Sequence, residues 1–382
     1  MSAVASLLRD LVALPSVNPM GRESAAEISC EHRVAAYLER FFRGLGVPYE
    51  KQQAAPGREN VVARFERPGA ARTILFEAHQ DTVPVTNMTV PPFEGKIEGN
   101  RMFGRGTCDV KGGMTSMLSA FARLVREKPA NAANVTMACT VDEEHTFLGV
   151  QELAKRGIHA DFAIVAEPTR LNIVHAHKGV VRWFIRTPGR ACHSSAPEKG
   201  VNAIYRMGKL LVAMERYAEE VRASVVDPLL GPATISVGMI EGGTSVNTVP
   251  DRCSIEIDRR VVGGEDPRLV RDQVSDWLRT KGGIDFPFEA TDTWICERAL
   301  VPTKADEAVT RLGRAINEVA GTHKVHSVPF GTDAATISFA GVPAIVFGPG
   351  DIAQAHTIDE WVPLDEVEKA ADILYRLATQ AD

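Results

Sequence analysis

The sequence contains no long apolar run. No stretch approaches the ~20 consecutive apolar residues that a membrane-spanning helix needs. An amphipathic helix is predicted over residues 1–14, but Arg9 and Asp10 interrupt its apolar side, so it is a poor core for a secretion signal. We therefore expect a cytoplasmic protein that does not associate with a membrane.

Cysteine is sparse, and there is little excess charge of either sign. Six cysteines are scattered over 382 residues, and no two of them form a CxxC pair. This pattern argues against a disulfide framework and against a zinc site built from thiolates. The formal net charge of −6 gives no electrostatic reason to expect a nucleic acid or an anionic membrane as a partner.

Several common catalytic motifs are also missing. The serine-hydrolase elbow G-x-S-x-G and the zinc-protease helix motif H-E-x-x-H do not occur. The glycine-rich segment 104–113 fits neither G-x-G-x-x-G nor the Walker pattern. The assignment as a nucleotide-dependent enzyme would rest on this segment alone and is therefore disfavoured. A metal-ligand loop that leads into a helix explains the segment better.

The length and the hydrophobic pattern predict two domains. A chain of 382 residues is too long for one ordinary hydrophobic core. Strands and helices alternate up to about residue 176, which predicts an α/β sheet covered on both faces. From 178 to 294 the order strand-helix-strand-strand-helix-strand is that of a small ferredoxin-like domain. We therefore predict a catalytic domain with a mixed sheet, formed by 1–177 and 295–382, and an inserted domain, 178–294.

The individual elements follow from apolar periodicity and from Pro and Gly signals. In the first domain we expect strands over 73–78, 135–141, 162–166 and 344–347, and helices over 112–125 and 305–319. In the inserted domain we expect strands over 180–187, 234–240, 253–260 and 286–291, and helices over 202–221 and 267–280.

Five metal-type ligands are expected at strand ends of the same sheet: His79, Asp109, Glu144, Glu167 and His356. In open α/β sheets that edge is where ligands bind. Two imidazoles and three carboxylates suit Zn(II), and also Co(II) or Mn(II). If Asp109 bridges two ions, each ion receives one histidine, one further carboxylate and the shared aspartate. An open position for water then remains at each ion.

Two further acids lie beside these ligands. Asp81 follows His79 by two residues, so on an extended chain its carboxylate can accept the second ring N–H of the imidazole. Glu143 adjoins Glu144 and points the other way, so it can face a water while Glu144 binds metal. Singly, such residues usually belong to solvated loops. Their expected convergence on one sheet edge is what favours a catalytic site.

Together these motifs resemble the M20 family of metallopeptidases and deacylases. The resemblance rests on His-Gln-Asp-Thr-Val-Pro at 79–84, Gly-Arg-Gly-x-x-Asp-x-Lys-Gly-Gly at 104–113, Asp-Glu-Glu at 142–144 and Ala-Glu-Pro-Thr at 166–169. It covers nearly the whole chain and keeps the motif order. The segment 347–356 and the overall length are similar to the acetylornithine deacetylase and aminoacylase side of the family.

The resemblance also implies roles for the predicted site residues. One ion would be held by His79, Asp109 and Glu167, and the other by Asp109, Glu144 and His356. Glu143 would be the general base, and Asp81 would be the partner of His79.

In the inserted domain, the resemblance implies a homodimer in which His193 reaches the active site of the partner subunit. Asn247 and Arg260 would hold the substrate carboxylate, and Gly331 and Thr332 would also contact the substrate. Arg259 faces the opposite way from Arg260 on a strand and is expected to be a surface or ion-pair arginine.

The function implied is metal-dependent hydrolysis of the amide bond of an N-acyl amino acid or short peptide. An acetylornithine deacetylase-like activity in arginine biosynthesis is the first choice. A dipeptidase, a carboxypeptidase and an N-succinyl-diaminopimelate desuccinylase are the alternatives within the family. A non-catalytic binding homologue ranks low, because all the predicted ligands and Glu143 are present.

Overall fold

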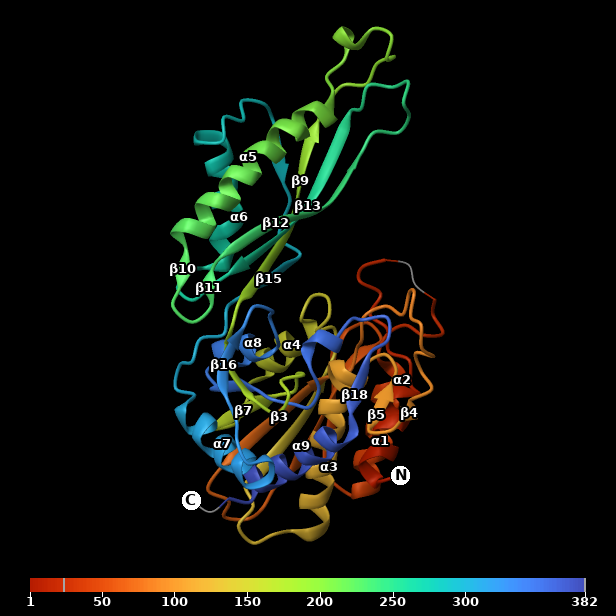
Figure 1. Cartoon of the computed structure of the whole chain (residues 1–382), viewed down its shortest axis with the longest axis vertical. Coiled ribbons are helices and arrows are strands. Elements are labelled where there is room, and N and C mark those ends of the chain that lie inside the picture. Colours follow the sequence, from red (N-terminus) through yellow and green to blue (C-terminus); the bar gives the residue numbers. More distant parts are fainter. Residues whose placement is uncertain (23–24, 381–382) are drawn as a thin grey trace. The chain divides into compact units, whose positions relative to one another are not determined.

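The structure is a computed structural model that describes residues 1–22 and 25–380. The chain forms two compact units (Figure 1). Unit 1 consists of Met1–His175, Pro302–Ser327 and Thr332–Asp382, and unit 2 of Ala176–Val301 and Val328–Gly331. The sequence predicts boundaries after 177 and 294. The contacts divide the chain after 175 and 301 and place 328–331 with unit 2.

Unit 1 is built on an eight-stranded mixed sheet with the order β1-β2-β6-β3-β7-β17-β8-β16. Its strands are β1 (Tyr49–Ala55), β2 (Arg58–Phe65), β3 (Thr73–His79), β6 (Asn134–Thr140), β7 (Phe162–Val165), β8 (Ile173–His177), β16 (Val325–Val328) and β17 (Ala344–Val346). The central strands β6, β3, β7 and β17 are parallel and almost wholly buried, as expected for a sheet covered on both faces. In register, His79 pairs with Thr140, and Glu77 pairs with Val165. The carboxyl ends of β6, β3 and β7 therefore lie side by side.

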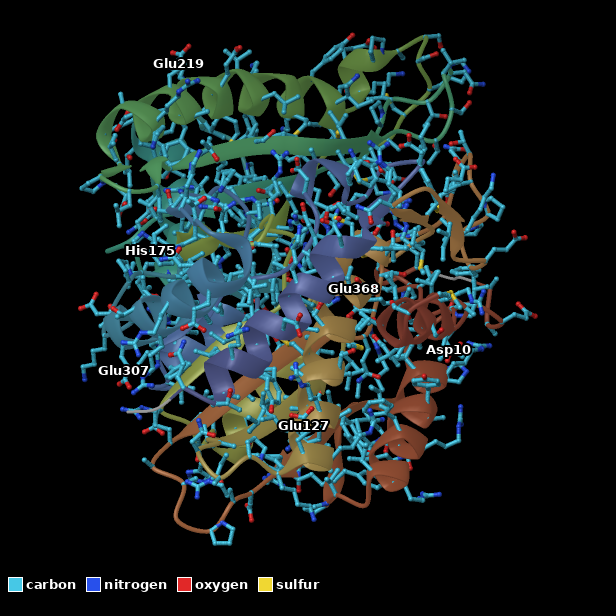
Figure 2. The ribbon with its side chains drawn as sticks, turned by 60° about the horizontal axis from the view of Figure 1, so that its bottom comes forward. Asp10, Glu127, His175, Glu219, Glu307 and Glu368 are labelled. Atoms are coloured by element: carbon cyan, nitrogen blue, oxygen red, sulfur yellow. The ribbon has the colours of Figure 1, made fainter. Side chains whose placement is uncertain are left out.

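Seven α-helices of unit 1 fall within the described residues: α1 (Ala3–Val12), α2 (His32–Leu45), α3 (Gly112–Glu127), α4 (Leu148–Arg156), α7 (Asp306–Ala320), α8 (Ala334–Phe339) and α9 (Leu364–Ala378). Helices α2, α3, α7 and α9 share one hydrophobic core with the sheet. In that core Phe42 and Phe121 meet edge to face, with ring centroids 5.7 Å apart. Acidic side chains of these helices, such as Glu127, Glu307 and Glu368, are exposed (Figure 2).

A small sheet with the order β18-β5-β4 completes the strands of unit 1 that bear on the site. It consists of β4 (Lys96–Glu98), β5 (Arg101–Phe103) and β18 (Trp361–Pro363). Because β18 pairs with β5, the segment that follows His356 lies beside the segment that precedes Asp109. Among the described residues, none of the helices combines the length and apolar character required to cross a membrane.

Unit 2 has its own sheet, with the order β12-β13-β9-β14 and with β15 also paired to β9. The strands are β9 (Gly179–Pro188), β12 (Thr234–Gly242), β13 (Arg252–Val261), β14 (Glu289–Ala290) and β15 (Ile295–Glu297), and a short hairpin joins β10 (Val226–Asp227) to β11 (Gly231–Pro232). Helices α5 (Ala203–Ser224) and α6 (Pro267–Thr280) pack on it. Alternate residues of β13 are buried, and Trp183 of β9 is fully buried in the core.

The predicted helix over 267–280 is confirmed to the residue, because Asp266 caps it and Pro267 begins it. The strand expected over 286–291 is wrong in extent, since β14 spans only Glu289–Ala290. Phe286 and Phe288 instead pack against the core of unit 2 from a loop. The mixed α/β class predicted from the sequence is confirmed.

Candidate metal centre

Three of the predicted ligands lie at the carboxyl edge of the central sheet. His79 is the last residue of β3, Glu144 lies in the turn after β6, and Glu167 follows β7 by two residues. The other two ligands do not follow strands of this sheet, so that expectation is wrong for them. Asp109 lies in the irregular helical turn η1 (Thr107–Lys111) that leads into α3, and His356 follows the short helix η3 (Ile352–Gln354).

The five ligands nevertheless come together, with the carboxylate of Asp109 between the two histidines. Asp109 Oδ1 lies 3.1 Å from His79 Nε2, and Oδ2 lies 3.3 Å from His356 Nε2. Glu144 Oε2 is 3.1 Å from His356 Nε2, and Glu167 Oε1 is 4.0 Å from His79 Nε2. Asp109 thus faces two ligand sets at once, one with His79 and Glu167 and one with Glu144 and His356.

The electrostatics of the centre fit a pair of cations. Burial and the neighbouring Asp109 charge raise the pKa of Glu144 to about 7, although His356 lowers it in part. Burial likewise raises the pKa of Glu167. Glu144 Oε1 is buried and has no hydrogen-bond partner among the described residues. Buried carboxylates are costly unless their charge is balanced, and divalent ions supply that balance.

Asp109 behaves differently from the two glutamates. Burial would raise its pKa, but hydrogen bonds from His356 and His79 outweigh burial and hold the pKa well below its usual range. Hydrogen bonds to Asp109 and Glu144 raise the pKa of His356 to about 11, against the effect of burial. Asp109 is therefore the ligand most strongly held in its charged form, as suits a carboxylate shared between two sites.

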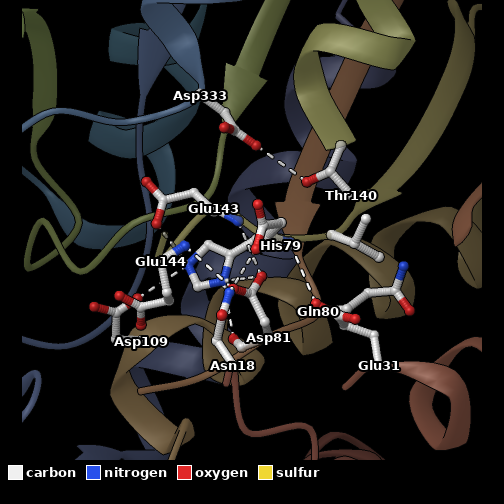
Figure 3. A network of polar contacts seen from close by, with 12 residues as sticks. Asn18, Glu31, His79, Gln80, Asp81, Asp109, Thr140, Glu143, Glu144 and Asp333 are labelled. Atoms are coloured by element: carbon white, nitrogen blue, oxygen red, sulfur yellow. Dashed lines mark hydrogen bonds and ion pairs between the residues drawn. The ribbon is translucent and has the colours of Figure 1, made fainter. Parts of the chain in front are cut away.

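The contact between His79 and residue 81 differs from the predicted one. His79 Nδ1 is 3.0 Å from the backbone carbonyl of Asp81, whereas the Asp81 carboxylate is 3.7 Å away. That carboxylate is turned towards the end of β6, where Oδ1 accepts from the backbone N–H of Glu143 and Oδ2 from that of Glu144, both at 3.1 Å (Figure 3). Asp81 therefore links the His79 strand to the turn that carries both glutamates.

Glu143 lies next to the ligands without completing either set. Its side chain is almost fully buried, and its Oε2 is 4.0 Å from His79 Nε2. Burial raises its pKa well above the ordinary value for glutamate, while His79 lowers it in part. A carboxylate of this kind beside a metal pair can take a proton from a water.

The loop that carries Asp109 is held by Glu360, a residue that the motifs did not single out. Glu360 is fully buried and pairs with Arg105 at 2.6 Å. Its carboxylate also accepts from the backbone N–H groups of Gly106, Cys108 and Asp109 at 3.1, 2.9 and 3.1 Å. The sequence signal that could have indicated Glu360 is its position four residues after His356 and directly before β18.

Close packing in the same loop explains one of its glycines. Gly106 has φ +82°, in the left-handed region that favours glycine. A Cβ added there would lie 2.7 Å from Thr82 Cγ2. Gly106 thus allows the Asp109 loop to approach Thr82, three residues after the end of β3.

Most of the residues predicted to contact the substrate lie in unit 2. His193 is exposed, with Nδ1 2.7 Å from Ser195 Oγ. Asn247 is exposed, and Arg260 pairs with Asp258 at 2.7 Å. Gly331 also belongs to unit 2.

Two residues near this group, Thr332 and Arg259, are buried. Thr332 is in unit 1, where it is buried and accepts from the backbone N–H of Ala334 at 3.2 Å. Arg259 is an ion-pair residue, 2.5 Å from Glu265, but it is buried rather than on the surface.

An α/β unit in which one aspartate faces two His-and-carboxylate ligand sets defines a candidate dinuclear metalloenzyme. Residues 75–380 match the model of peptidase family M20/M25/M40. The chain is 32% identical over 349 residues to an acetylornithine deacetylase from Myxococcus xanthus, which covers 89% of this chain and 90% of that protein. The chain therefore belongs to peptidase family M20/M25/M40, and the resemblance seen in its motifs is confirmed.

One further relative and two solved structures are also similar to this chain, the structures in fold. A probable carboxypeptidase from Aspergillus clavatus is 29% identical over 389 residues and covers 97% of this chain and 86% of that protein. The fold is similar to that of an M20 family metallo-carboxypeptidase from Sulfolobus solfataricus, with a TM-score of 0.79, 20% identity and 99% coverage of both chains. It is also similar to a dinuclear metal-binding M20 peptidase from Bacillus subtilis, with a TM-score of 0.68, 16% identity, and coverage of 98% and 96%.

Proposed function

We propose that this protein is a cytoplasmic hydrolase of N-acyl amino acids, with N-acetylornithine as its leading substrate and arginine biosynthesis as its setting. The observation that carries the proposal is the placement of the two Asp109 oxygens towards two separate ligand sets. The acetylornithine deacetylase relative supports the choice of substrate.

The cofactor we propose is a pair of Zn(II) ions, with Co(II) or Mn(II) as alternatives that suit the same donors. His79, Asp109 and Glu167 would hold one ion, and Asp109, Glu144 and His356 the other. Such ions, when bound, lower the pKa of a water and polarise an amide carbonyl.

Glu143 is the proposed catalytic base. Its buried carboxylate accepts a proton from the attacking water and returns it to the nitrogen of the departing amine. Asp81 keeps Glu143 in place, because its Oδ1 binds the backbone N–H of Glu143. It also orients His79 through its backbone carbonyl, which fixes the imidazole tautomer.

For unit 2 we propose a ferredoxin-like lid domain that also forms a homodimer. In support, β9, α5, β12, β13, α6 and β14 follow one another in the βαββαβ order, apart from the short β10–β11 hairpin. Strand β12 is at the edge of its sheet and exposes Met239 and Ile240. An exposed edge strand is a template for pairing with another chain.

The substrate contacts we propose come largely from this domain. A planar guanidinium such as that of Arg260 can bind the substrate carboxylate in bidentate fashion, with Asn247 beside it. His193 of the partner subunit is proposed to stabilise the oxyanion that develops on the amide carbonyl. Gly331 and Thr332 are proposed to line the same substrate site.

A carboxypeptidase or dipeptidase is the second candidate. The same carboxylate grip would hold the C-terminal residue of a peptide, and the Aspergillus clavatus relative is named a probable carboxypeptidase. An N-succinyl-diaminopimelate desuccinylase is a further rival within the family.

A substrate panel on metal-reconstituted protein tests the proposal. It should contain N-acetylornithine, other N-acetyl and N-succinyl amino acids, and dipeptides, with the Glu143→Gln variant as a blank. We expect the highest kcat/KM for N-acetylornithine. Faster cleavage of dipeptides or N-succinyl compounds would transfer the assignment to those classes. The absence of any turnover by the metal-loaded protein would refute the hydrolase proposal.

A further inference from the structure

The turn after β6 has three consecutive backbone N–H groups that are bound by two buried carboxylates. The N–H of Asp142 donates to Glu31 Oε1 at 3.3 Å, and those of Glu143 and Glu144 donate to Asp81 at 3.1 Å each. Asp142 has φ +66°, an unfavourable conformation for a residue with a side chain. The conformation of this turn is therefore held by contacts from other parts of the chain.

Asn18 joins the two sides of this turn. Its Nδ2 donates to Asp81 Oδ2 at 2.7 Å (Figure 3). It also donates to Asp142 Oδ1 at 2.9 Å, so both hydrogens of its amide are used. Its Oδ1 accepts from the backbone N–H of Met20 at 2.9 Å, and its own backbone N–H donates to the carbonyl of Thr82 at 2.8 Å. The side chain is fully buried, so water cannot replace these donors.

Arg58, at the start of β2, holds the far side of the same turn. Its Nη1 lies 2.5 Å from Asp142 Oδ1, and its Nε donates to Glu31 Oε2 at 2.9 Å, with a second bond from Nη2 to Glu31 Oε1. Burial raises the pKa of Glu31 even with this arginine beside it. Arg58 therefore brings positive charge to a buried group of three carboxylates, those of Glu31, Asp81 and Asp142.

We propose that Asn18 and Arg58 are positioning residues for the turn that carries Glu143 and Glu144. Each acts through Asp142, and Asn18 also acts through Asp81. Removing either one frees the turn to shift, which moves the base and one ligand together. Displacements of about 1 Å at a reacting group can cost ~100-fold in rate.

The competing explanation is that this network only stabilises the fold. Both explanations predict a lower melting temperature when the network is cut. Only positioning predicts that kcat falls while KM stays nearly constant, and that the coordination of the ion beside Glu144 changes in protein that remains folded.

The experiment compares Asn18→Leu, which keeps the branching at Cγ and removes both donors, with Arg58→Met and the control Asn134→Ala. Asn134 begins β6 at the opposite end from the turn and accepts from the backbone N–H of Arg67 at 2.8 Å. For each protein we would measure the melting temperature, kcat and KM on the best substrate of the panel, Co(II) affinity, and the absorption spectrum of the Co(II) form.

We expect Asn18→Leu and Arg58→Met to lose about 10- to 100-fold in kcat, with altered Co(II) spectra. The control should keep the kcat and spectrum of the original protein. Both variants with the original kcat and spectrum would overturn the proposal. If Asn18→Leu does not fold, Asn18→Ser and Arg58→Lys replace these variants under the same criteria.

The kinetic arm rests on the proposed hydrolase activity, whereas the Co(II) arm rests only on the proposed pair of metal ions. A protein that binds two Co(II) ions yet cleaves no compound of the panel would refute the hydrolase proposal. In that case the change in the Co(II) spectrum alone would decide whether Asn18 and Arg58 position Glu144.

Discussion

The buried carboxylate of Glu360 accepts a hydrogen bond from the backbone N–H of Asp109 at 3.1 Å. A residue four positions after one ligand, His356, thus fixes the loop of another. The same carboxylate binds the backbone N–H groups of Gly106 and Cys108 and pairs with Arg105. Glu360 therefore holds the loop of Asp109, the residue that both ligand sets share.

The Glu360→Gln variant should bind divalent ions about 10- to 100-fold more weakly. Glutamine would present an amide donor to backbone N–H groups and would leave Arg105 without its buried counter-charge. Calorimetric titration of metal-free protein with Zn(II) or Co(II) measures the change. Glu368→Gln, at an exposed position of α9, is the control. Equal affinities in the two variants would contradict the role given to Glu360.

The Glu143→Gln variant should keep its metal and lose its activity. The amide cannot accept the proton of the attacking water, and we expect turnover to fall by at least ~100-fold. The structure places the Glu143 side chain outside both ligand sets, so metal content should not change. Metal analysis and steady-state kinetics on the same preparation test both parts. Full activity in this variant would exclude Glu143 as the base.

The His193→Ala variant should fold and bind metal normally, because its side chain is exposed and contacts Ser195 within its own loop. If it stabilises the oxyanion, kcat should fall by about 100- to 1000-fold. His159→Ala removes an exposed histidine of unit 1 and serves as the control. Unchanged kinetics in His193→Ala would remove this residue from the mechanism.

His177 should make the stability of the protein sensitive to acid. It is fully buried, and burial lowers its pKa from 6.5 to about 4. Between these values the unfolded chain binds more protons than the folded one. The stability contributed by the neutral ring is therefore present above about pH 6.5 and lost as the pH falls towards 4. The difference between the two pKa values corresponds to about 3 kcal/mol.

Urea unfolding at several pH values tests this prediction. The His177→Gln variant keeps a hydrogen-bond donor but does not titrate, so its stability should fall less between about pH 7 and about pH 5. Metal release affects both proteins in the same way, so only the difference between their pH profiles is used. Identical pH profiles would show that His177 does not contribute.

Much of the sheet could be predicted because its central strands are nearly continuous apolar runs. The ends of β3, β6 and β7 were visible in the sequence, and they placed His79, Glu144 and Glu167 at one edge. In the structure β3 and β6 pair in parallel with His79 opposite Thr140. These positions depend on local pattern and on general rules of sheet geometry.

The positions of Asp109 and His356 depend on contacts between segments that are distant in sequence. Hydrophobic periodicity does not predict such contacts. Asp109 and His356 lie in loops that are brought together by Glu360 and by the pairing of β5 with β18. Asn18 and Arg58 come from segments without a recognisable motif. The sequence pattern grouped Asp109 and His356 with the other ligands as strand-end residues, a reason that the structure contradicts. The motif resemblance is therefore the sequence signal that correctly indicated these two residues.

The position of His356 and Glu360 far along the chain sets the order in which the centre can be assembled during translation. Four ligands leave the ribosome early, but the Asp109 loop lacks its anchor until Glu360 has also emerged. The residues of unit 2 come between these ligands and Glu360 in the sequence, so they are synthesised before Glu360. A nascent chain therefore exposes loose acids and one histidine rather than a formed metal centre. A premature stop before residue 356 would remove His356 from one candidate ligand set and the Glu360 anchor from the Asp109 loop, while sparing the other four candidate ligands.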